Sequence, residues 1–142
     1  RTRLSSLYES SKVIADAAPL KFSGRILIVD DNAANLKSMG DQIKSTGLEI
    51  YMVKNGADAI IACEHHRFDL ILMDIQMPVM DGLEATSRIR QIMKDQTPPI
   101  IGVSAHVLEE NITNAKQAGM QDYLCKPITK EALLSKIAEY FT

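Results

Sequence analysis

The sequence predicts a doubly wound α/β fold, in which helices cover both faces of one parallel sheet. Five short apolar runs alternate with five segments of helical character from Arg25 onward. The runs at 25–29 and 70–73 are almost continuously apolar, as expected of strands that are buried on both faces. Polar residues follow the ends of these runs, where an open parallel sheet carries its functional crevice.

The first strand, at 25–29, leads into a helix at 33–45, where apolar residues recur every three or four positions. Gly47 follows this segment and is placed to end the helix, because glycine readily adopts the left-handed conformation found after helices. A short second strand is expected at 49–53.

Turn residues mark the next elements. The dipeptide Asn55-Gly56 opens a helix at 57–65, and the third strand ends at Asp74. A loop that contains Pro78 then leads to a helix at 83–93.

The last part of the chain contains two more strand and helix pairs. A strand at 100–103 precedes a weaker helix at 109–117, and a strand at 123–125 precedes a helix at 130–140 that Thr129 caps. Right-handed crossovers between five parallel strands give a three-layer (βα)5 sandwich. Its expected strand order is 2-1-3-4-5, which is the flavodoxin-like arrangement.

Composition is that of an ordinary soluble domain. The chain has 142 residues, of which 46% are apolar and 24% charged, with a net charge of -2. The absence of a basic excess argues against nucleic acid as a partner. No apolar run approaches the roughly 20 residues of a membrane span, so no direct membrane contact is expected.

Residues 1–22 differ from the rest of the chain. They are expected to be an N-terminal linker or helical extension that precedes one domain at 23–142. They are rich in Ser and Ala, and Pro19 interrupts them. Their weak apolar stripe fits either a frayed helix or a signalling helix that docks on a partner. The stripe consists of Leu4, Leu7, Ile14 and Ala17.

The two cysteines, Cys63 and Cys125, form no CxxC motif and indicate no disulfide framework. Both are expected to be small buried hydrophobes, although Cys125 lies beside Lys126 and could instead be a partly exposed thiol. A reducing, cytoplasmic setting follows, with no recognisable signal peptide. That setting includes the cytoplasmic part of a membrane-bound sensor.

Three acids are expected to meet at one edge of the sheet. Asp30 and Asp31 follow the first strand, and Asp74 closes the third. Carboxylates held close together resist joint ionisation unless a cation intervenes. Mg²⁺ is the natural cation, because it prefers oxygen ligands. Asp31 considered alone could instead be the N-cap of the next helix.

A hydroxyl and an ammonium reach the same edge, from Ser104 and Lys126. Considered alone, Ser104 could be a loop-capping residue and Lys126 a solvated charge at the end of a strand. Together with the acids they suit phosphoryl transfer, which requires neutralised charge and in-line groups. Asp74 can be the nucleophile that becomes an aspartyl phosphate. Lys126 would then contact the phosphoryl oxygens as a point charge, and Ser104 would donate a hydrogen bond to one of them.

These motifs resemble the receiver domain of two-component response regulators. The resemblance rests on Val29-Asp-Asp-Asn32, on the stretch 73–82 (Met-Asp-Ile-Gln-Met-Pro-Val-Met-Asp-Gly), on Val103-Ser-Ala105 and on Cys125-Lys-Pro127. It covers about residues 24–142. The stretch 73–82 is especially similar to receivers fused to hybrid sensor histidine kinases.

The resemblance implies specific roles. Asp74 accepts phosphate from a histidine, on a kinase dimerisation domain or a histidine phosphotransfer protein. Asp30 and Asp31 hold Mg²⁺ together with Asp74 and the backbone carbonyl of Gln76, and Lys126 contacts the phosphate. The Lys126-Pro127 bond is expected to be cis.

The resemblance also implies a switch, in which Ser104 and Tyr123 are the moving pair. Phosphorylation would draw the Ser104 hydroxyl inward and free space for the Tyr123 ring, so that the face formed by 106–118, the fifth strand and the last helix repacks. The alternative is a purely structural role for Tyr123, as a half-buried aromatic residue of a strand. Gln76 and His106, two residues beyond Asp74 and Ser104, are hypothesised to tune the lifetime of the phosphate.

Three other functions compete with this one. A phosphatase of the haloacid dehalogenase type needs a second acid at position 76, where this chain has Gln76. A flavin mononucleotide binder needs a Ser/Thr/Gly-rich loop after the first strand, where this chain has acids. A degenerate receiver that acts only through protein contacts is argued against by the complete set of reactive groups.

The chain is expected to catalyse only its own phosphorylation and dephosphorylation. No output domain is expected after the last helix. The opening on Arg1, the lead-in and the pattern at 73–82 favour a receiver taken from a hybrid histidine kinase. The alternative is a stand-alone response regulator.

Overall fold

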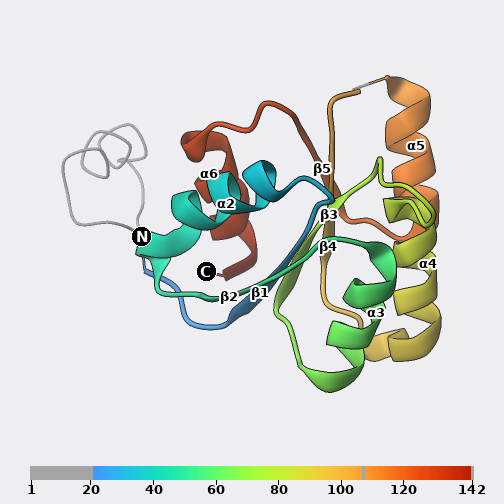
Figure 1. The fold of residues 1–142 in the computed structure, drawn as a ribbon, viewed down its shortest axis with the longest axis horizontal. Helices are drawn as coiled ribbons and strands as arrows, with labels where there is room; N and C mark the ends of the chain where they lie inside the picture. The colour runs from blue at the N-terminus through green and yellow to red at the C-terminus, as the bar shows by residue number, and fades with distance from the viewer. Residues whose placement is uncertain (1–20, 107, 142) are drawn as a thin grey trace.

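The computed structural model describes residues 21–106 and 108–141. Five parallel strands form one sheet in the order β2-β1-β3-β4-β5, which confirms the predicted doubly wound topology. Figure 1 shows α2 and α6 on one face of the sheet, with α3, α4 and α5 on the other. The strands are β1 (Arg25–Val29), β2 (Glu49–Val53), β3 (Leu70–Asp74), β4 (Ile100–Ser104) and β5 (Asp122–Cys125). The α-helices are α2 (Ala33–Ile43), α3 (Gly56–His65), α4 (Gly82–Met93), α5 (Glu109–Ala118) and α6 (Lys130–Phe141).

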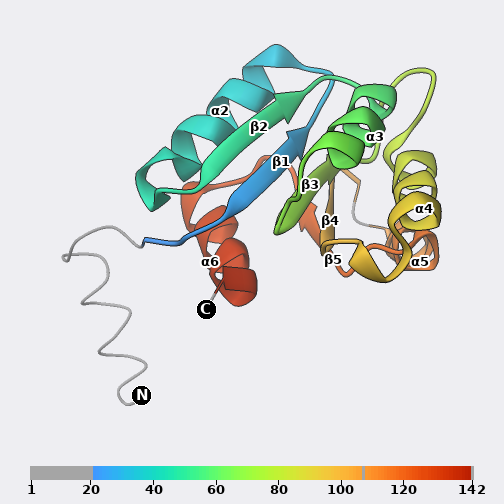
Figure 2. The ribbon, with the colours of Figure 1, turned by 90° about the horizontal axis from the view of Figure 1, so that it is seen from below.

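The central strand β3 is buried along its whole length, because both faces of the sheet are covered. Alternate residues of a strand point to opposite faces, so Ile71 and Met73 enter one core while Leu70 and Leu72 enter the other. Figure 2 shows the strands side by side, with β3 in the middle of the sheet. This placement carries Asp74, the last residue of β3, to the centre of one sheet edge.

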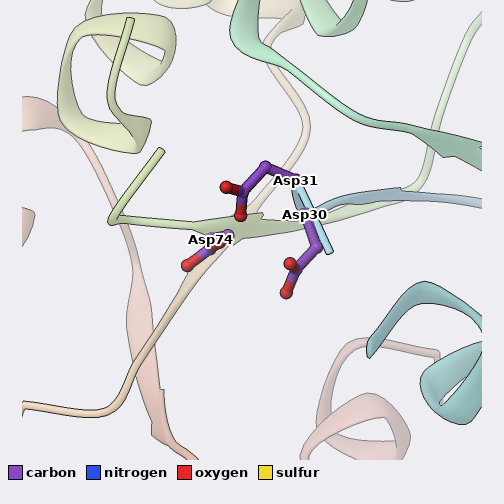
Figure 3. A group of neighbouring side chains, drawn as sticks. All are labelled: Asp30, Asp31 and Asp74. Carbon is purple, nitrogen blue, oxygen red and sulfur yellow. The ribbon is translucent and has the colours of Figure 1, made fainter. Parts of the chain in front are cut away.

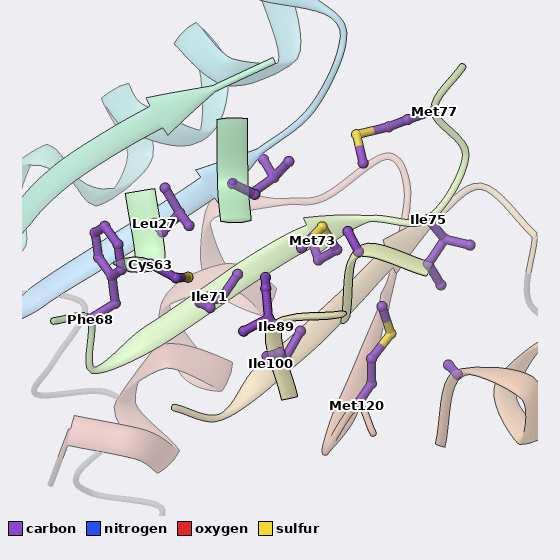
Figure 4. Close-up of a cluster of buried hydrophobic side chains, with 14 residues drawn as sticks. Leu27, Cys63, Phe68, Ile71, Met73, Ile75, Met77, Ile89, Ile100 and Met120 are labelled. Carbon is purple, nitrogen blue, oxygen red and sulfur yellow. The ribbon is translucent and has the colours of Figure 1, made fainter. Parts of the chain in front are cut away.

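The larger core lies between the sheet and helices α3, α4 and α5 (Figure 4). Small residues on the helices, such as Ala59 and Ala85, let the backbones approach the strands closely, and Ile89 and Phe68 fill the remaining space. The second core is formed against α2 and α6 by Leu36, Met39, Ile43, Leu133 and Ile137.

Side-chain caps fix where the helices begin. Asn32, Asn55 and Asp81 each accept a hydrogen bond from the backbone three residues later, at 3.0, 2.7 and 2.9 Å. The hydroxyl of Thr129 accepts from Ala132 N at 3.1 Å, as predicted. Asn32, and not Asp31, therefore caps α2, which leaves the Asp31 carboxylate available at the sheet edge.

Helix boundaries differ from the expected ones by one or two residues. Helix α2 ends at Ile43 and continues as a 3-10 turn over Lys44–Thr46, and Gly47 follows in the left-handed conformation with φ 84°. Helices α3 and α4 each begin one residue early, since their caps at Asn55 and Asp81 set the start.

The segment before β1 is tied to the domain from Phe22 onward. Phe22 N donates to the carbonyl of Thr46 at 2.7 Å, and its ring stacks on Phe141 with centroids 5.8 Å apart. Of the linker or helical extension expected over residues 1–22, residues 1–20 lie outside the described part of the chain.

The cysteines differ from each other. Cys63 is buried in the larger core, as expected, whereas Cys125 is exposed. The expectation of two buried thiols was therefore wrong for Cys125, and the exposed-thiol alternative holds. Within the described part of the chain, no helix has the length and hydropathy needed to cross a bilayer.

Candidate functional site

Three carboxylates meet at the edge of the sheet where β1 and β3 end. Asp30, Asp31 and Asp74 each offer an oxygen, and these oxygens all lie within 4.8 Å of one another (Figure 3). Strand pairing explains the meeting, because Val29 lies opposite Met73 and each is followed directly by an acid. Asp30 and Asp74 are buried, at 0% and 2% exposure, whereas Asp31 is exposed.

The ammonium of Lys126 bridges the two buried acids. Its Nζ lies 3.3 Å from Asp30 Oδ2 and 3.3 Å from Asp74 Oδ1. Lys126 directly follows β5, and its backbone N–H donates to the carbonyl of Ser104 at 2.8 Å, which fixes the end of β5 against β4. The bond between Lys126 and Pro127 is cis, as expected.

One ammonium does not balance two buried carboxylates and a third nearby. The pKa of Asp74 is raised to about 6, first by burial and then by the charge of Asp30, and Lys126 only partly offsets these two effects. Burial alone lowers the pKa of Lys126, but Asp74 and Asp30 outweigh it, so the net shift is upward. The site therefore has an excess of negative charge and favours a bound cation.

The donor set fits Mg²⁺. Its members are carboxylate oxygens, which this ion prefers, and they all lie within 4.8 Å of one another, close enough to share one ion. The exposed Asp31 leaves one side open to solvent, as suits an ion that keeps several waters.

Two asparagines that sequence reasoning missed hold Asp30 in place. Asn32 N donates to Asp30 Oδ1 at 2.9 Å, and the Asn35 side-chain amide lies 3.4 Å from each Asp30 oxygen. The signal was present in the sequence, because Asn32 and Asn35 lie three residues apart across the first turn of α2 and so share one face.

A close backbone approach fixes the loop that follows Asp74. Gly82 N donates to the carbonyl of Ile75 at 2.9 Å. A Cβ atom at Gly82 would overlap the carbonyl oxygen of Asp74 and lie 2.8 Å from Ile75 Cα. Only glycine allows this approach, so Gly82 is part of the support of the acceptor residue.

The Ser104 hydroxyl is buried and engaged. Ser104 follows Val103, the residue that pairs with Asp74 across β3 and β4. Its hydroxyl donates to Gln76 Oε1 at 2.8 Å and accepts from His106 N at 3.0 Å. The side chains of Gln76 and His106 are themselves exposed.

Tyr123 joins this arrangement from β5. Its hydroxyl donates to the backbone carbonyl of His106, and its ring packs against the edge of the larger core. The predicted pair of Ser104 and Tyr123 is thus connected through the backbone of one residue, His106.

A shallow cavity of about 350 Å³ opens beside Lys126. Lys126 lies in its wall with the apolar side chains of Met39, Pro127 and Ile128, and Asn35 lies at its polar side. The cavity therefore adjoins the acidic cluster through Lys126, whose ammonium contacts Asp30 and Asp74.

Comparisons with known proteins show which family the chain belongs to. Residues 26–138 match the family described as the response regulator receiver domain. The chain is 38% identical to the sensor protein GacS of Pseudomonas syringae pv. syringae over 142 residues, which cover 96% of this chain and 16% of GacS. It thus spans less than a fifth of that relative.

Solved structures have the same fold. The receiver domain of the sensor histidine kinase PA1611 from Pseudomonas aeruginosa, which has a magnesium ion in its active site cleft, is 36% identical, with a TM-score of 0.76 and 83% and 97% of the two chains covered. The receiver domain of Ssk1 from Saccharomyces cerevisiae, crystallised with the histidine phosphotransfer protein Ypd1, is 28% identical, with a TM-score of 0.80 and coverage of 87% and 92%. The chain therefore belongs to the response regulator receiver domains of two-component signalling systems.

Proposed function

We propose that this receiver takes a phosphoryl group from a phosphohistidine onto Asp74. The observation that carries the proposal is the placement of Asp74, buried at the end of the central strand, close to two other acids and 3.3 Å from the Lys126 ammonium. A carboxylate held beside an ammonium that can also contact the incoming group is a suitable nucleophile for a phosphoryl group.

The transfer exchanges one bond for another. An oxygen of Asp74 attacks phosphorus, the new O–P bond forms as the P–N bond to the histidine breaks, and the electron pair stays on the imidazole nitrogen, which takes a proton from solvent. Lys126 lies where its ammonium can neutralise a phosphoryl oxygen, and the Ser104 hydroxyl can donate to another.

Asp30, Asp31 and Asp74, with the backbone carbonyl of Gln76, would hold Mg²⁺, which when bound supplies positive charge to the phosphoryl oxygens. Asn32 and Asn35 keep the Asp30 carboxylate oriented toward the cluster. This orientation reduces the cost of ordering the ligand when the ion binds.

The donor would be a histidine kinase dimerisation domain or a histidine phosphotransfer protein. The cavity beside Lys126 supports this, because its apolar wall of Met39, Pro127 and Ile128 suits a packed helix that carries a histidine to the acids. The Ssk1 receiver crystallised with such a protein is a precedent.

Phosphorylation would switch the face formed by β4, α5, β5 and α6. A phosphoryl group that draws the Ser104 hydroxyl toward it acts on His106, and through the carbonyl of His106 on Tyr123. The exposed side chains of Gln76 and His106 would also influence the approach of a hydrolytic water and so the lifetime of the phosphate.

The parent would be a hybrid sensor histidine kinase, since GacS is a sensor protein and has a region similar to this chain. In that architecture the receiver works in the cytoplasm, where ATP phosphorylates the donor histidine. A stand-alone regulator is the alternative.

Intact mass spectrometry tests the proposal most directly. The protein is incubated with Mg²⁺ and acetyl phosphate, and Asp74→Asn is treated in parallel. We expect the original protein to gain one phosphoryl group. The group should not be added when a chelator removes Mg²⁺, nor to the variant. A protein that gains no phosphoryl group and binds no phosphate mimic would be a receiver that acts by contact alone.

A further inference from the structure

The single proton of the Ser104 hydroxyl is already donated to another side chain in the unphosphorylated protein. Ser104 is fully buried, and its hydroxyl donates to Gln76 Oε1 at 2.8 Å while accepting from His106 N at 3.0 Å. The donor distance is that of a well-formed O–H···O hydrogen bond. Gln76 itself is exposed on the loop after β3, so its carboxamide reaches in from the surface to this buried hydroxyl.

A hydroxyl has a single proton to donate. The Ser104 proton can therefore go to the Gln76 carboxamide or to a phosphoryl oxygen on Asp74, but not to both. The acceptor role is different, because the hydroxyl oxygen has two lone pairs and can keep the bond from His106 N in either case. Phosphorylation thus has to break the bond to Gln76.

We propose that Gln76 is a positioning residue that holds the Ser104 hydroxyl in the unphosphorylated arrangement and so opposes the switch. This inference rests on the proposed acceptor role of Asp74, and it adds a specific restraint to it. In this restraint the side chain of Gln76 acts through Ser104, which is separate from any influence it has on a hydrolytic water.

The restraint extends beyond the loop after β3. The His106 N–H donates to the Ser104 hydroxyl, and the His106 carbonyl accepts from the Tyr123 hydroxyl. Gln76 on the β3 side is therefore linked to Tyr123 on β5 through Ser104 and the backbone of His106. Movement of the Ser104 hydroxyl away from Gln76 acts on His106, whose carbonyl is the acceptor for Tyr123.

The test compares the affinity of the protein for beryllium trifluoride, used with Mg²⁺ as a stable mimic of the phosphoryl group. Gln76→Met keeps the length of the side chain and removes the acceptor. We expect it to bind the mimic about fivefold more tightly, because one hydrogen bond no longer has to be broken. Asn111→Ala is the matched control, because Asn111 lies in the same shallow surface pocket as Gln76 and makes no side-chain hydrogen bond to Ser104.

A second readout separates positioning from a general structural effect. In the unliganded protein, the backbone amide resonance of His106 in Gln76→Met should move toward its mimic-bound position, while Asn111→Ala leaves it in place. In a Ser104→Ala background, Gln76→Met should no longer change the affinity, since the hydroxyl it acts through is gone.

The outcomes distinguish this inference from the proposed function. If the original protein binds the mimic and Gln76→Met binds it with equal or lower affinity, the restraint is refuted while the acceptor role stands. A gain in affinity that persists in the Ser104→Ala background also refutes it. If the original protein neither binds the mimic nor is phosphorylated, the proposed function fails and this inference fails with it.

Discussion

At the scale of the residue, the site is governed by an imbalance of charge around Asp74. Two buried acids share the Lys126 ammonium, with Nζ at 3.3 Å from each, and Asp31 adds a third negative group close by. Burial and the charge of Asp30 hold the pKa of Asp74 at about 6, above its ordinary 3.8. The acids that would bind a cation therefore lower the stability of the folded protein when no cation is bound.

The sign of this effect predicts a stabilising substitution. Because the folded pKa of Asp74 is the higher one, the folded protein binds more protons than the unfolded chain between about pH 4 and 6, and stability falls as the pH rises through that interval. Asp74→Asn removes the buried charge and should raise the free energy of unfolding at pH 7.5 by roughly 2 kcal/mol. Urea denaturation with a chelator present measures this.

The pH dependence is the control for that prediction. The advantage of Asp74→Asn over the original protein should shrink at pH 5, where Asp74 is mostly protonated in the folded state. An advantage that is the same at both pH values would mean that the substitution acts by packing and not by charge.

Lys126 should have the opposite role in stability. Lys126→Met leaves Asp30 and Asp74 without a cation in a buried setting, so we expect a loss of about 1–3 kcal/mol in metal-free protein at pH 7.5. The matched control is Lys37→Met, which removes an exposed pair with Asp41 and should cost less than about 0.5 kcal/mol. Equal losses in the two variants, measured by urea denaturation, would contradict the assigned bridge.

At the scale of the element, the position of Asp74 depends on how closely the start of α4 approaches the end of β3. A Cβ atom at Gly82 would overlap the Asp74 carbonyl oxygen, which is backbone and cannot rotate away. Gly82→Ala should therefore cost roughly 2–3 kcal/mol and slow phosphorylation by acetyl phosphate, because the strand end has to shift.

Gly40 offers the contrasting substitution within the same protein. It lies in α2, and its Cβ would meet Met52 Sδ at 3.5 Å, an ordinary contact. Gly40→Ala should raise the free energy of unfolding by about 0.5–1 kcal/mol, since alanine loses less backbone freedom in a helix. Thermal unfolding of both variants would contradict the argument if Gly82→Ala were as well tolerated as Gly40→Ala.

The elements themselves were predictable from local patterns, and the contacts between loops were not. Apolar runs such as 70–73 identify buried strands, and the acids at their ends follow from the geometry of a parallel sheet. The bond between Gln76 and Ser104 depends on the path of a loop, to which no periodicity applies. The exposure of Cys125 was not predictable from the apolar run either, because Cys125 is the last residue of the edge strand β5 and lies beyond Leu124, which is buried in the second core.

At the scale of the whole molecule, the extent of the domain is set by contacts far apart in the sequence. Phe22 stacks on Phe141 at 5.8 Å, close to the end of α6, and its N–H donates to Thr46 after α2. Through these contacts, both ends of the described chain pack against the second core. The residues from Phe22 onward therefore contribute to the stability of the domain.

Two truncations test this boundary. Removal of residues 1–20 keeps every contact described above, so we expect an unchanged melting temperature and unchanged phosphorylation by acetyl phosphate. Removal of residues 1–22 also deletes the Phe22 ring and its hydrogen bond, and should lower the melting temperature by about 3–5 °C, as a loss near 1 kcal/mol does in a domain of this size. A fall in melting temperature on removal of 1–20 alone would show that the lead-in packs on the domain, and it would favour a docking helix over a linker.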